Sequence, residues 1–330
     1  MRDDPSLRGK PVAVAGSSRR AVVLTATYEA RPFGVKSAVP LYRARAACPQ
    51  LIVVPPDHAK YRIVSTQIFE LFAAHGAVEG LSLDEAFVDF GDIGIQEAER
   101  LAQTIRDEVL RTTQLTISAG VSQAKMVAKI ASDLCKPNGL MAIAPGGEAA
   151  FLAPLPVSRL WGIGPKTVPR LAARGIETIG DLAALDDAQL RSIFGSWGEE
   201  LRELARGRDR RRVESSRETK SISTEWTFEY DVVDEYELLD LLRVQAAELS
   251  EKLEREGLYT ATIGVKIKRS DFSVFGRQTH LEQPVRSTER IFEASSHCLR
   301  RAALKGMPVR LLGTRCATFT TQEPQQESLF

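Results

Sequence analysis

Two adjacent carboxylates, Asp84 and Glu85, interrupt the otherwise apolar segment 81–90, and Asp89 follows closely. A strand that packs against apolar neighbours rarely carries paired carboxylates unless a positive charge lies against them. Mg²⁺ commonly supplies that charge, and it prefers carboxylates together with substrate phosphates. Because adjacent strand residues point to opposite faces, these carboxylates converge only at a turn or a bulge. The pattern predicts a magnesium site, with a solvated turn between two strands as the alternative.

The composition is that of an ordinary globular chain of 330 residues, 43% hydrophobic and 26% charged. It is long enough for two or three domains. No apolar run approaches the ~20 residues of a membrane span, and the first residues are too polar for a signal peptide. The four cysteines lie far apart without a CxxC spacing. We therefore expect a cytoplasmic protein with neither a zinc site nor disulfides.

Basic residues are concentrated in two segments, although the net charge is only +1. Residues 206–212 read Arg-Gly-Arg-Asp-Arg-Arg-Arg, and residues 264–315 hold eleven Lys or Arg against four Asp or Glu. Acidic residues are concentrated in 225–256. Such segregation suits a polyanion bound on one face, although a solvated face is the commoner explanation.

The elements that must position the acidic pair lie in the first half of the chain. Two apolar runs on either side of a Gly-Ser-Ser-Arg-Arg turn predict a hairpin over 12–26. Periodicity predicts a strand pair over 81–90, a strand over 115–121, and helices over 57–74, 97–110 and 125–134. Lys136-Pro-Asn-Gly then predicts a break, because proline and glycine interrupt regular structure.

Residues 150–212 change in character and are predicted to be all-helical. They contain Trp161-Gly-Ile-Gly-Pro-Lys-Thr and, at 175–182, a second Gly-Ile repeat. Two short helices joined by a Gly-x-Gly hairpin leave backbone N–H groups free at the second helix, and these bind phosphate without reading sequence. Gly162, Gly164 and Lys166 of this hairpin therefore favour phosphate binding over a plain helix–helix turn.

A polar linker over 213–220 precedes a second region of mixed structure. The predicted order is a strand (221–230), a helix (235–256), two strands (259–269 and 272–281), a helix (287–303) and a strand (309–319). This β-α-β-β-α-β order is the split βαβ layout. Asp234 is expected to cap the first helix, with a buried stripe of Leu238, Leu242, Leu249 and Leu253.

Positive charge on this second region predicts contact with nucleic acid. Lys266, Lys268 and Arg269 bring it to the open face of the sheet. The chain then ends in a Pro- and Gln-rich tail and Gln326-Glu-Ser-Leu-Phe. Large apolar residues at a free terminus, Leu329 and Phe330, cannot add to a core, so they predict an anchor for another protein's pocket.

Taken together and in order, these motifs resemble the Y-family translesion DNA polymerases of the bacterial DNA polymerase IV type. The segment Thr25-Ala-Thr-Tyr-Glu-Ala-Arg-Pro-Phe-Gly-Val-Lys-Ser is similar to the family's fingers. Segments 82–89, 118–122 and 129–139 resemble its palm. The Gly-Ile-Gly hairpin resembles the thumb, and the split βαβ unit resembles the little finger. The resemblance covers essentially the whole chain.

The resemblance implies an α+β, multidomain right-hand polymerase. Its parts would be the fingers (1–57), the palm (58–143), a helical thumb with a helix-hairpin-helix (144–212), the linker (213–220), the little finger (221–319) and a tail with a clamp-binding peptide (320–330). The implied activity is template-directed DNA synthesis by two Mg²⁺ ions. This synthesis would be error-prone, poorly processive and lesion-bypassing, without proofreading.

The family motif also implies roles for single residues. Asp84 would bridge the two metal ions, and Glu85 would bind the ion that activates the primer 3′-hydroxyl. Tyr28 and Arg31 would bond the incoming deoxynucleoside triphosphate, because arginine meets phosphate oxygens bidentately; an ordinary surface helix start is the alternative. Thr25 would lie beside them, and Lys136 would be a further phosphate contact.

The implied partners are primer–template DNA and a sliding clamp. The hairpin and the basic sheet would hold the DNA, and Gln326, Leu329 and Phe330 would bind the clamp. We expect a monomer without a membrane partner. Thr27 stands where the family often has Asn before the tyrosine, and we expect no loss of function from it.

One departure from the family pattern concerns the start of the chain. In the family, a first strand precedes the segment Arg2-Asp-Asp-Pro and carries another metal-bridging aspartate and an aromatic steric gate against ribonucleotides. Loss of a shared carboxylate should cripple two-metal chemistry, and loss of the strand should expose a sheet edge.

Two explanations compete. The start codon is assigned too far downstream in a longer active polymerase, or the short form is a catalytically impaired factor that binds DNA and the clamp. We favour the first, because the remaining site residues are all present. A plain DNA-binding scaffold built on the helix-hairpin-helix is a third hypothesis.

Overall fold

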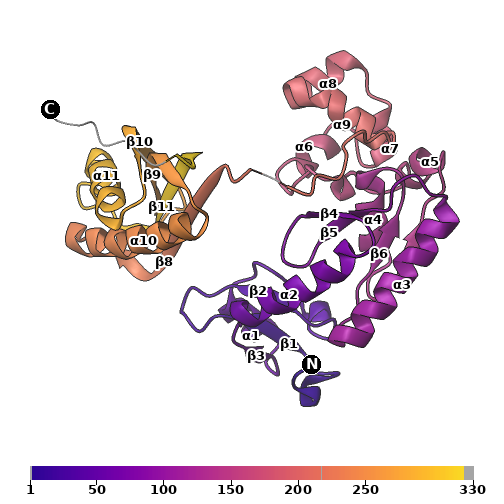
Figure 1. Cartoon of the computed structure of the whole chain (residues 1–330), viewed down its shortest axis with the longest axis horizontal. Coiled ribbons are helices and arrows are strands. Elements are labelled where there is room, and N and C mark those ends of the chain that lie inside the picture. The colour runs from indigo at the N-terminus through magenta and orange to yellow at the C-terminus, as the bar shows by residue number, and fades with distance from the viewer. Residues whose placement is uncertain (1, 217, 323–330) are drawn as a thin grey trace. The chain divides into compact units, whose positions relative to one another are not determined.

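The computed structural model describes residues 2–216 and 218–322, which form two compact units (Figure 1). Unit 1 comprises Met1–Arg8 and Asp57–Arg217, and unit 2 comprises Gly9–Pro56 and Glu218–Phe330. None of the described helices is long and apolar enough to cross a membrane.

Two separate strand pairs form the sheets of unit 1. β4 (Ala77–Gly80) pairs antiparallel with β5 (Ala86–Asp89), and β6 (Ala119–Val121) pairs parallel with β7 (Leu140–Ala142). The strand pair predicted over 81–90 was therefore placed too late, because 81–85 form the turn between the strands. Ser82 and Asp84 bond to each other there, and such side chains favour turns over ladders. The strand predicted over 115–121 is reduced to its last three residues.

Three long helices of unit 1 flank these strands. They are α2 (His58–Ala73), α3 (Ile95–Thr113) and α4 (Lys125–Leu134), so the three helices predicted from periodicity are confirmed. Asp57 caps α2 by accepting a hydrogen bond from the Lys60 amide at 3.0 Å. α4 packs against β6 so closely that a Cβ on Gly120 would lie 2.0 Å from the Ala128 carbonyl oxygen.

The all-helical prediction for 150–212 holds as far as Ala205. The helices are α5 (Glu148–Leu152), α6 (Val168–Ala172), α7 (Ile179–Ala183), α8 (Asp187–Phe194) and α9 (Gly198–Ala205). The buried leucines of α5, α6, α7 and α9 share one core with Met126, Val127 and Ile130 of α4. Since α4 also packs on β6, it belongs both to the helical part and to the strand-bearing part of unit 1.

The first part of unit 2 is a small sheet with strand order β2-β1-β3. β1 (Val12–Ala15) pairs antiparallel with β2 (Val23–Ala26), which confirms the predicted hairpin, and parallel with β3 (Ile52–Val54). A short helix, α1 (Leu41–Ala47), contributes Ala44 to the core beneath this sheet.

The second part of unit 2 has the predicted β-α-β-β-α-β order. Its elements are β8 (Ser221–Val232), α10 (Glu235–Arg255), β9 (Tyr259–Arg269), β10 (Val274–Val285), α11 (Thr288–Arg301) and β11 (Val309–Thr320). The strand order is β10-β9-β11-β8, and β11 runs antiparallel to both β8 and β9. β8 and β9 are therefore parallel to each other and separated by β11, which confirms the split βαβ layout.

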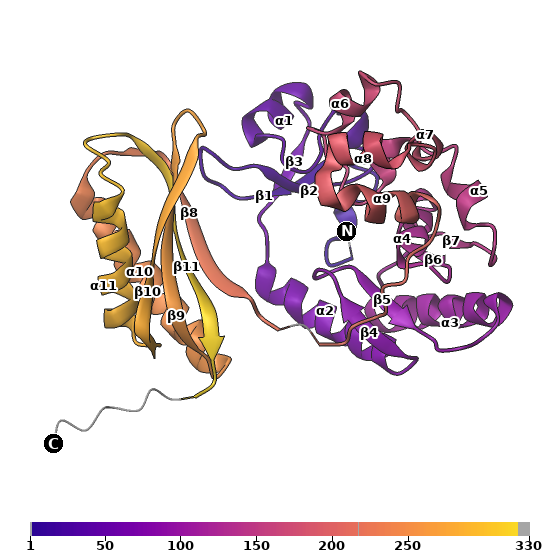
Figure 2. The ribbon, with the colours of Figure 1, turned by 90° about the horizontal axis from the view of Figure 1, so that it is seen from above.

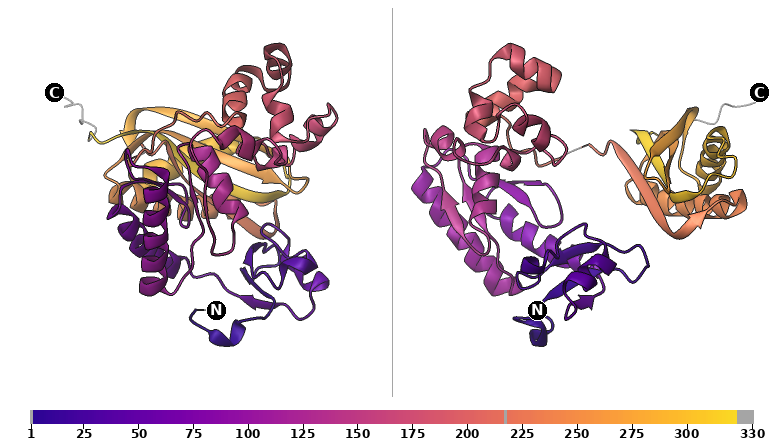
Figure 3. Two further views of the ribbon diagram at one scale, coloured as in Figure 1. Left: turned by 90° about the vertical axis from the view of Figure 1, so that its right-hand side faces the viewer. Right: turned by 180° about the vertical axis from the view of Figure 1, so that it is seen from behind.

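Both helices of this sheet cover the same face, so its other face is open (Figures 2 and 3). The Asp234 carboxylate caps α10 by accepting from the Tyr236 amide at 2.9 Å, as expected. The predicted stripe of Leu238, Leu242, Leu249 and Leu253 is fully buried against the sheet. Local pattern therefore placed both the helix and its buried side correctly.

Candidate active site

The acidic pair lies in the turn between β4 and β5, where two adjacent carboxylates can point the same way. The Leu81 amide closes this turn by donating to the Glu85 carbonyl at 2.9 Å. Ser65 of α2 holds the turn from outside, since its hydroxyl donates to the Leu83 carbonyl at 2.6 Å. Asp84 is exposed, and Glu85 is half-buried. Asp89 lies in β5 and accepts from the Gly91 amide, so it serves a separate local turn.

Two lysines from the region of α4 lie at this turn. Lys129 Nζ donates to Glu85 Oε1 at 2.9 Å. Lys136 follows the helix and donates to Asp133; that hydrogen bond raises the pKa of Lys136, and the charges of Glu85 and Asp84 add to the effect. Unit 1 thus brings Asp84, Glu85 and Lys136 together. The role of Lys129 was missed, although it lies within a quoted motif and one turn along a correctly predicted helix.

Carboxylate oxygens are the donors that Mg²⁺ prefers, so Asp84 and Glu85 suit a hard cation in kind. In the described parts of the chain, however, no group of three or more His, Cys, Asp or Glu side chains is arranged to hold a metal ion. A cation on Glu85 also competes with the Lys129 ammonium. The turn therefore offers two protein ligands, and the remaining ligands must come from phosphates, water or another segment.

The strands of unit 1 leave edges unpaired beside the turn. Among the described residues, the β4–β5 pair and the β6–β7 pair form no ladder with each other or with a further strand. Unpaired backbone N–H and C=O groups at such edges can accept another strand.

In unit 2, Tyr28 and Arg31 lie together just after β2. The Arg31 guanidinium carbon is 4.0 Å from the centre of the Tyr28 ring, and Arg31 Nε donates to the Ala26 carbonyl at 3.3 Å. Thr25, within β2, is exposed. Stacking on the ring limits the rotation of the guanidinium and leaves its outer edge able to donate.

Thr27 has a structural role beside this pair. Its hydroxyl accepts from the Val12 amide and donates to the Lys10 carbonyl, both at 3.0 Å. It therefore ties the end of β2 to the start of β1. This accounts for a hydroxyl residue at the position where the family often has Asn.

The glycine hairpin joins a single 3₁₀ turn, Val157–Arg159, to α6, so the first of the two predicted helices is only one turn long. Ile163 is buried in the helical core, whereas Lys166 is exposed. Gly162 has φ of +100°, and a Cβ there would lie 2.3 Å from Cη2 of Trp197. The conformation and the space both require glycine at this position. The Gly164 carbonyl accepts hydrogen bonds from the Thr167 and Val168 amides at the start of α6.

The basic residues of β9 are divided between the two faces of the sheet. Ile263, Val265 and Ile267 are buried beneath the helices, so the alternation places Lys266 and Lys268 on the open face and Arg269 on the other. Lys266 Nζ is paired with Glu225 at 2.8 Å, and the Lys268 ammonium lies 4.8 Å from the centre of the Phe272 ring.

Arg315 was missed as a basic residue of this open face. It is exposed, and the register of β11 on β9 places it opposite Gly264, on the same face as Lys266. Alternation within 309–319 was the signal, because Leu312, Thr314 and Cys316 are its buried neighbours. Gln326, Leu329 and Phe330, which were predicted to bind a clamp, lie outside the described residues.

Solved structures resemble the whole chain. A Y-family DNA polymerase chimera of Dbh and Dpo4 has a TM-score of 0.89 and 28% identity, and the match covers 97% of this chain and 94% of the chimera. An insertion ternary complex of Dbh DNA polymerase has a TM-score of 0.68 and 27% identity, covering 97% and 95%. The fold is therefore that of the Y-family DNA polymerases, an α+β multidomain architecture of palm, fingers, thumb and little finger.

Sequence comparison leads to the same class. Residues 1–133 match the impB/mucB/samB family, residues 145–176 its helix-hairpin-helix motif and residues 219–329 its C-terminal domain. The DNA polymerase IV of Xanthomonas campestris pv. campestris is 43% identical over 98% of this chain and 91% of its own length. That of Stenotrophomonas maltophilia is also 43% identical, over 98% and 92%.

The chain thus belongs to the impB/mucB/samB family of Y-family DNA polymerases and is of the DNA polymerase IV type, which confirms the resemblance read from its motifs.

Proposed function

We propose that this chain extends a DNA primer along a template by two-metal nucleotidyl transfer, as an error-prone, lesion-bypassing polymerase without proofreading. The observation that carries the proposal is the turn that presents Asp84 and Glu85 beside Lys129 and Lys136, in a chain of polymerase fold. Two bound Mg²⁺ ions would supply the activation of the primer hydroxyl and the stabilisation of charge on the phosphates.

The residues of the turn have distinct proposed tasks. Asp84, exposed and oriented by the Ser82 hydroxyl, would contact both ions, and Glu85 would contact the ion on the primer side. The Lys136 ammonium is charged at neutral pH, as for an ordinary lysine, and its bond to Asp133 raises its pKa further, so it can neutralise phosphate. Lys129 neutralises Glu85 until a cation arrives, and this prevents repulsion between the two carboxylates.

Tyr28 and Arg31 are proposed to bind the triphosphate, with Thr25 beside them. The stacked guanidinium is already ordered by the ring and by its bond to Ala26, so little rotational freedom is lost when it meets a phosphate.

We propose that the glycine hairpin and the open sheet face hold primer–template DNA. Gly162, Gly164 and Lys166 would contact phosphates, as would Lys266, Lys268 and the added Arg315 on the open face; Arg269, which lies on the other face, is no longer included. Phosphate contacts of this kind fix the position of a duplex without reading its sequence. The domain division expected from the resemblance, with fingers in 1–57 and a little finger in 221–319, is part of the proposal.

The tail is proposed to bind a sliding clamp through Gln326, Leu329 and Phe330. A monomer with a loose grip on DNA would be poorly processive, and a tether would raise its local concentration at the primer end. Removing the last five residues should then lower processivity on clamp-loaded DNA and leave synthesis without the clamp unchanged.

A catalytically impaired factor that binds DNA and the clamp is the second candidate. Two observations favour it: the turn offers only two carboxylates, and the neighbouring strands have unpaired edges within the described residues. An added strand bearing an aspartate would remedy both. The discriminating comparison is therefore between the 330-residue chain and a form extended through the codons upstream of Met1.

Primer extension in Mg²⁺ tests these alternatives. We expect the extended form to synthesise DNA and Asp84→Ala to reduce its rate at least about 100-fold, since metal ligands contribute several kcal/mol to the transition state. Asp89→Asn, an exposed acid of the same hairpin, is the matched control. Unchanged synthesis by Asp84→Ala would refute the assigned site. DNA binding without synthesis by either form would favour the impaired factor, and robust synthesis by the short form would refute the need for a third carboxylate.

A further inference from the structure

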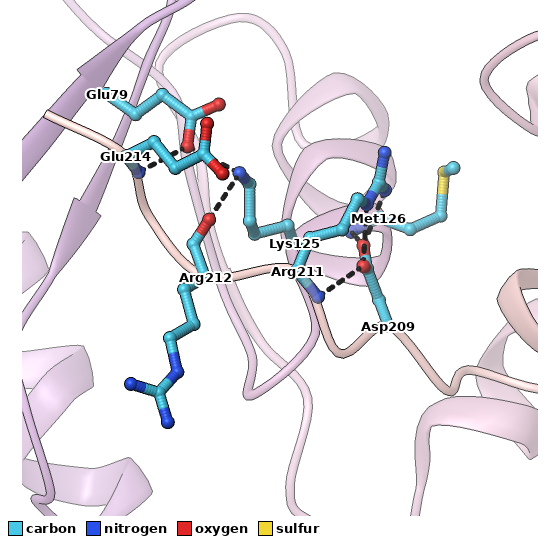
Figure 4. A network of polar contacts seen from close by, with 7 residues as sticks. All are labelled: Glu79, Lys125, Met126, Asp209, Arg211, Arg212 and Glu214. Carbon is cyan, nitrogen blue, oxygen red and sulfur yellow. Dashed lines mark hydrogen bonds and ion pairs between the residues drawn. The ribbon is translucent and has the colours of Figure 1, made fainter. Parts of the chain in front are cut away.

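The helix that carries Lys129 and precedes Lys136 has no side-chain cap of its own. α4 begins after Ala124, whose side chain cannot accept a hydrogen bond, and an uncapped first turn leaves amides unsatisfied. Asp209, which follows the last helix of this region, supplies the missing acceptor: its Oδ2 accepts from the Met126 amide at 3.0 Å (Figure 4). Asp209 follows α9, so the cap comes from a segment of the same chain 83 positions away from Met126.

Asp209 is held rigidly for this task. Its side chain is 1% exposed, and Arg211 donates to its two oxygens at 2.7 and 2.6 Å. Burial opposes ionisation of Asp209, but the bonds and charge of Arg211, with the Met126 amide, outweigh it and keep the pKa of the carboxyl below its ordinary value. The cap is therefore a charged carboxylate at neutral pH, which also suits the positive end of the helix dipole.

A second attachment lies next to the first. We call residues 206–214 the strap. Lys125, the first residue of α4, donates to Glu79 at 2.5 Å and to the Arg212 carbonyl at 3.0 Å. The buried Glu79 of β4 also accepts from the Glu214 amide at 2.9 Å. One carboxylate thus joins β4, the start of α4 and the end of the strap, which overlaps the first residues of the linker.

The position of α4 determines where the active-site lysines lie. Lys129 is one turn beyond Lys125 and bonds Glu85, and Lys136 follows the end of the helix. A shift of the first turn along the axis therefore moves both ammonium groups relative to the carboxylate turn. Displacements of about 1 Å at a reacting centre can change a rate by about 100-fold.

The strap also alters the interpretation of the basic run at 206–212. Arg208, Arg210, Arg211 and Arg212 are exposed, whereas the side chain of Asp209 is buried and paired with Arg211. The run is therefore not a uniform polyanion-binding surface, and the acid within it has a structural purpose.

We propose that Asp209 is a positioning residue for nucleotidyl transfer. It caps α4 from a distant segment of the same chain and thereby holds Lys129 and Lys136 beside the acidic turn. The kinetic part of this proposal rests on the proposed function. Through Glu79, the same contacts fix the point from which the linker leaves unit 1.

Hydrogen exchange of the full chain tests the cap without any activity. We expect Asp209→Ala to speed exchange of the Met126 amide about fivefold or more, as loss of a helix cap predicts. Asp209→Asn retains an acceptor, so its Met126 amide should exchange at a rate between those of the wild type and Asp209→Ala. Asp187→Ala is the matched control, because it removes an exposed carboxylate paired with Arg202 in the same helical region. Equal Met126 exchange in Asp209→Ala and the control would overturn the cap.

Two further measurements test the positioning. Acylation of lysines in the free protein, read by mass spectrometry, should rise at Lys129 in Asp209→Ala, since Lys129 loses its fixed contact with Glu85. In primer extension by the form that proves active, Asp209→Ala should lower kcat/KM for the nucleotide by about tenfold and leave DNA affinity unchanged, with partial rescue by Asn. A weakened cap with unchanged Lys129 labelling would overturn the positioning role, whether or not the chain is an active polymerase.

Discussion

Gly162→Ala should destabilise the glycine hairpin of the thumb, because Gly162 has both a positive φ and a close neighbour. Its φ of +100° is unfavourable for any residue with a side chain, at a cost of about 1–3 kcal/mol. The new methyl group would also lie 2.3 Å from Cη2 and 2.8 Å from Cζ2 of Trp197. Overpacking of this kind costs about 1–3 kcal/mol. Because Trp197 is 36% exposed and its ring can move, we expect a total destabilisation of about 2–4 kcal/mol.

Urea unfolding followed by tryptophan fluorescence measures this loss, and amide exchange over 157–205 assigns it to the helical region. Gly164→Ala is the matched control in the same hairpin, since no atom lies within 4 Å of its added Cβ and its φ is not positive. We expect it to change the free energy of unfolding by less than about 0.5 kcal/mol.

A second substitution separates the two causes. In a Trp197→Ala background, Gly162→Ala should cost only the backbone term of about 1–3 kcal/mol. Equal stabilities of Gly162→Ala and Gly164→Ala would refute both the steric and the conformational argument.

Three other outcomes follow from the contacts described above. Glu79→Ala should lower the free energy of unfolding by about 3 kcal/mol, because the largely buried Lys125 loses its carboxylate partner. Glu293→Ala, in an exposed ion pair, should cost less than about 0.5 kcal/mol. Lys266→Ala should reduce the slope of log affinity for DNA against log salt by about 1, and an unchanged slope would mean that its pairing with Glu225 persists in the complex. The pKa of Asp209 is lowered by folding, so its contribution is present above the unfolded value of about 3.9 and is lost as the pH falls through the folded value. The stability difference between wild type and Asp209→Asn, followed by urea unfolding, should therefore narrow below about pH 4; a difference independent of pH would contradict this.

Elements whose pattern is local were predicted well from the sequence. The cap at Asp234 and the leucine stripe of α10 both lie within one helix, and the structure has them as expected. The strand pair over 81–90 was misplaced because its apolar residues continue through a turn. That turn is formed by hydrogen bonds of Ser82 and Ser65, and Ser65 belongs to a different helix.

The site shows the same division between local and distant information. Asp84, Glu85 and Lys136 were selected from their motifs, and unit 1 places them in one electrostatic neighbourhood. Lys129 was missed because its contact with Glu85 spans 44 positions and has no signal in spacing. Arg269 was assigned to the open face, but strand alternation places it on the other face of the sheet from Lys266 and Lys268.

The motifs by themselves determined that the chain is a Y-family polymerase and that its last domain is a split βαβ unit, because these depend on residue types and short-range periodicity. They also selected the residues that we propose to carry its chemistry. Only the tertiary structure decided that Asp209, within a basic run, caps the helix bearing Lys129, and that Glu79 binds the strap to it. Those bonds join segments 83 and 135 positions apart. Hydrogen bonds depend on distance in space, and the chain sets that distance only when it folds.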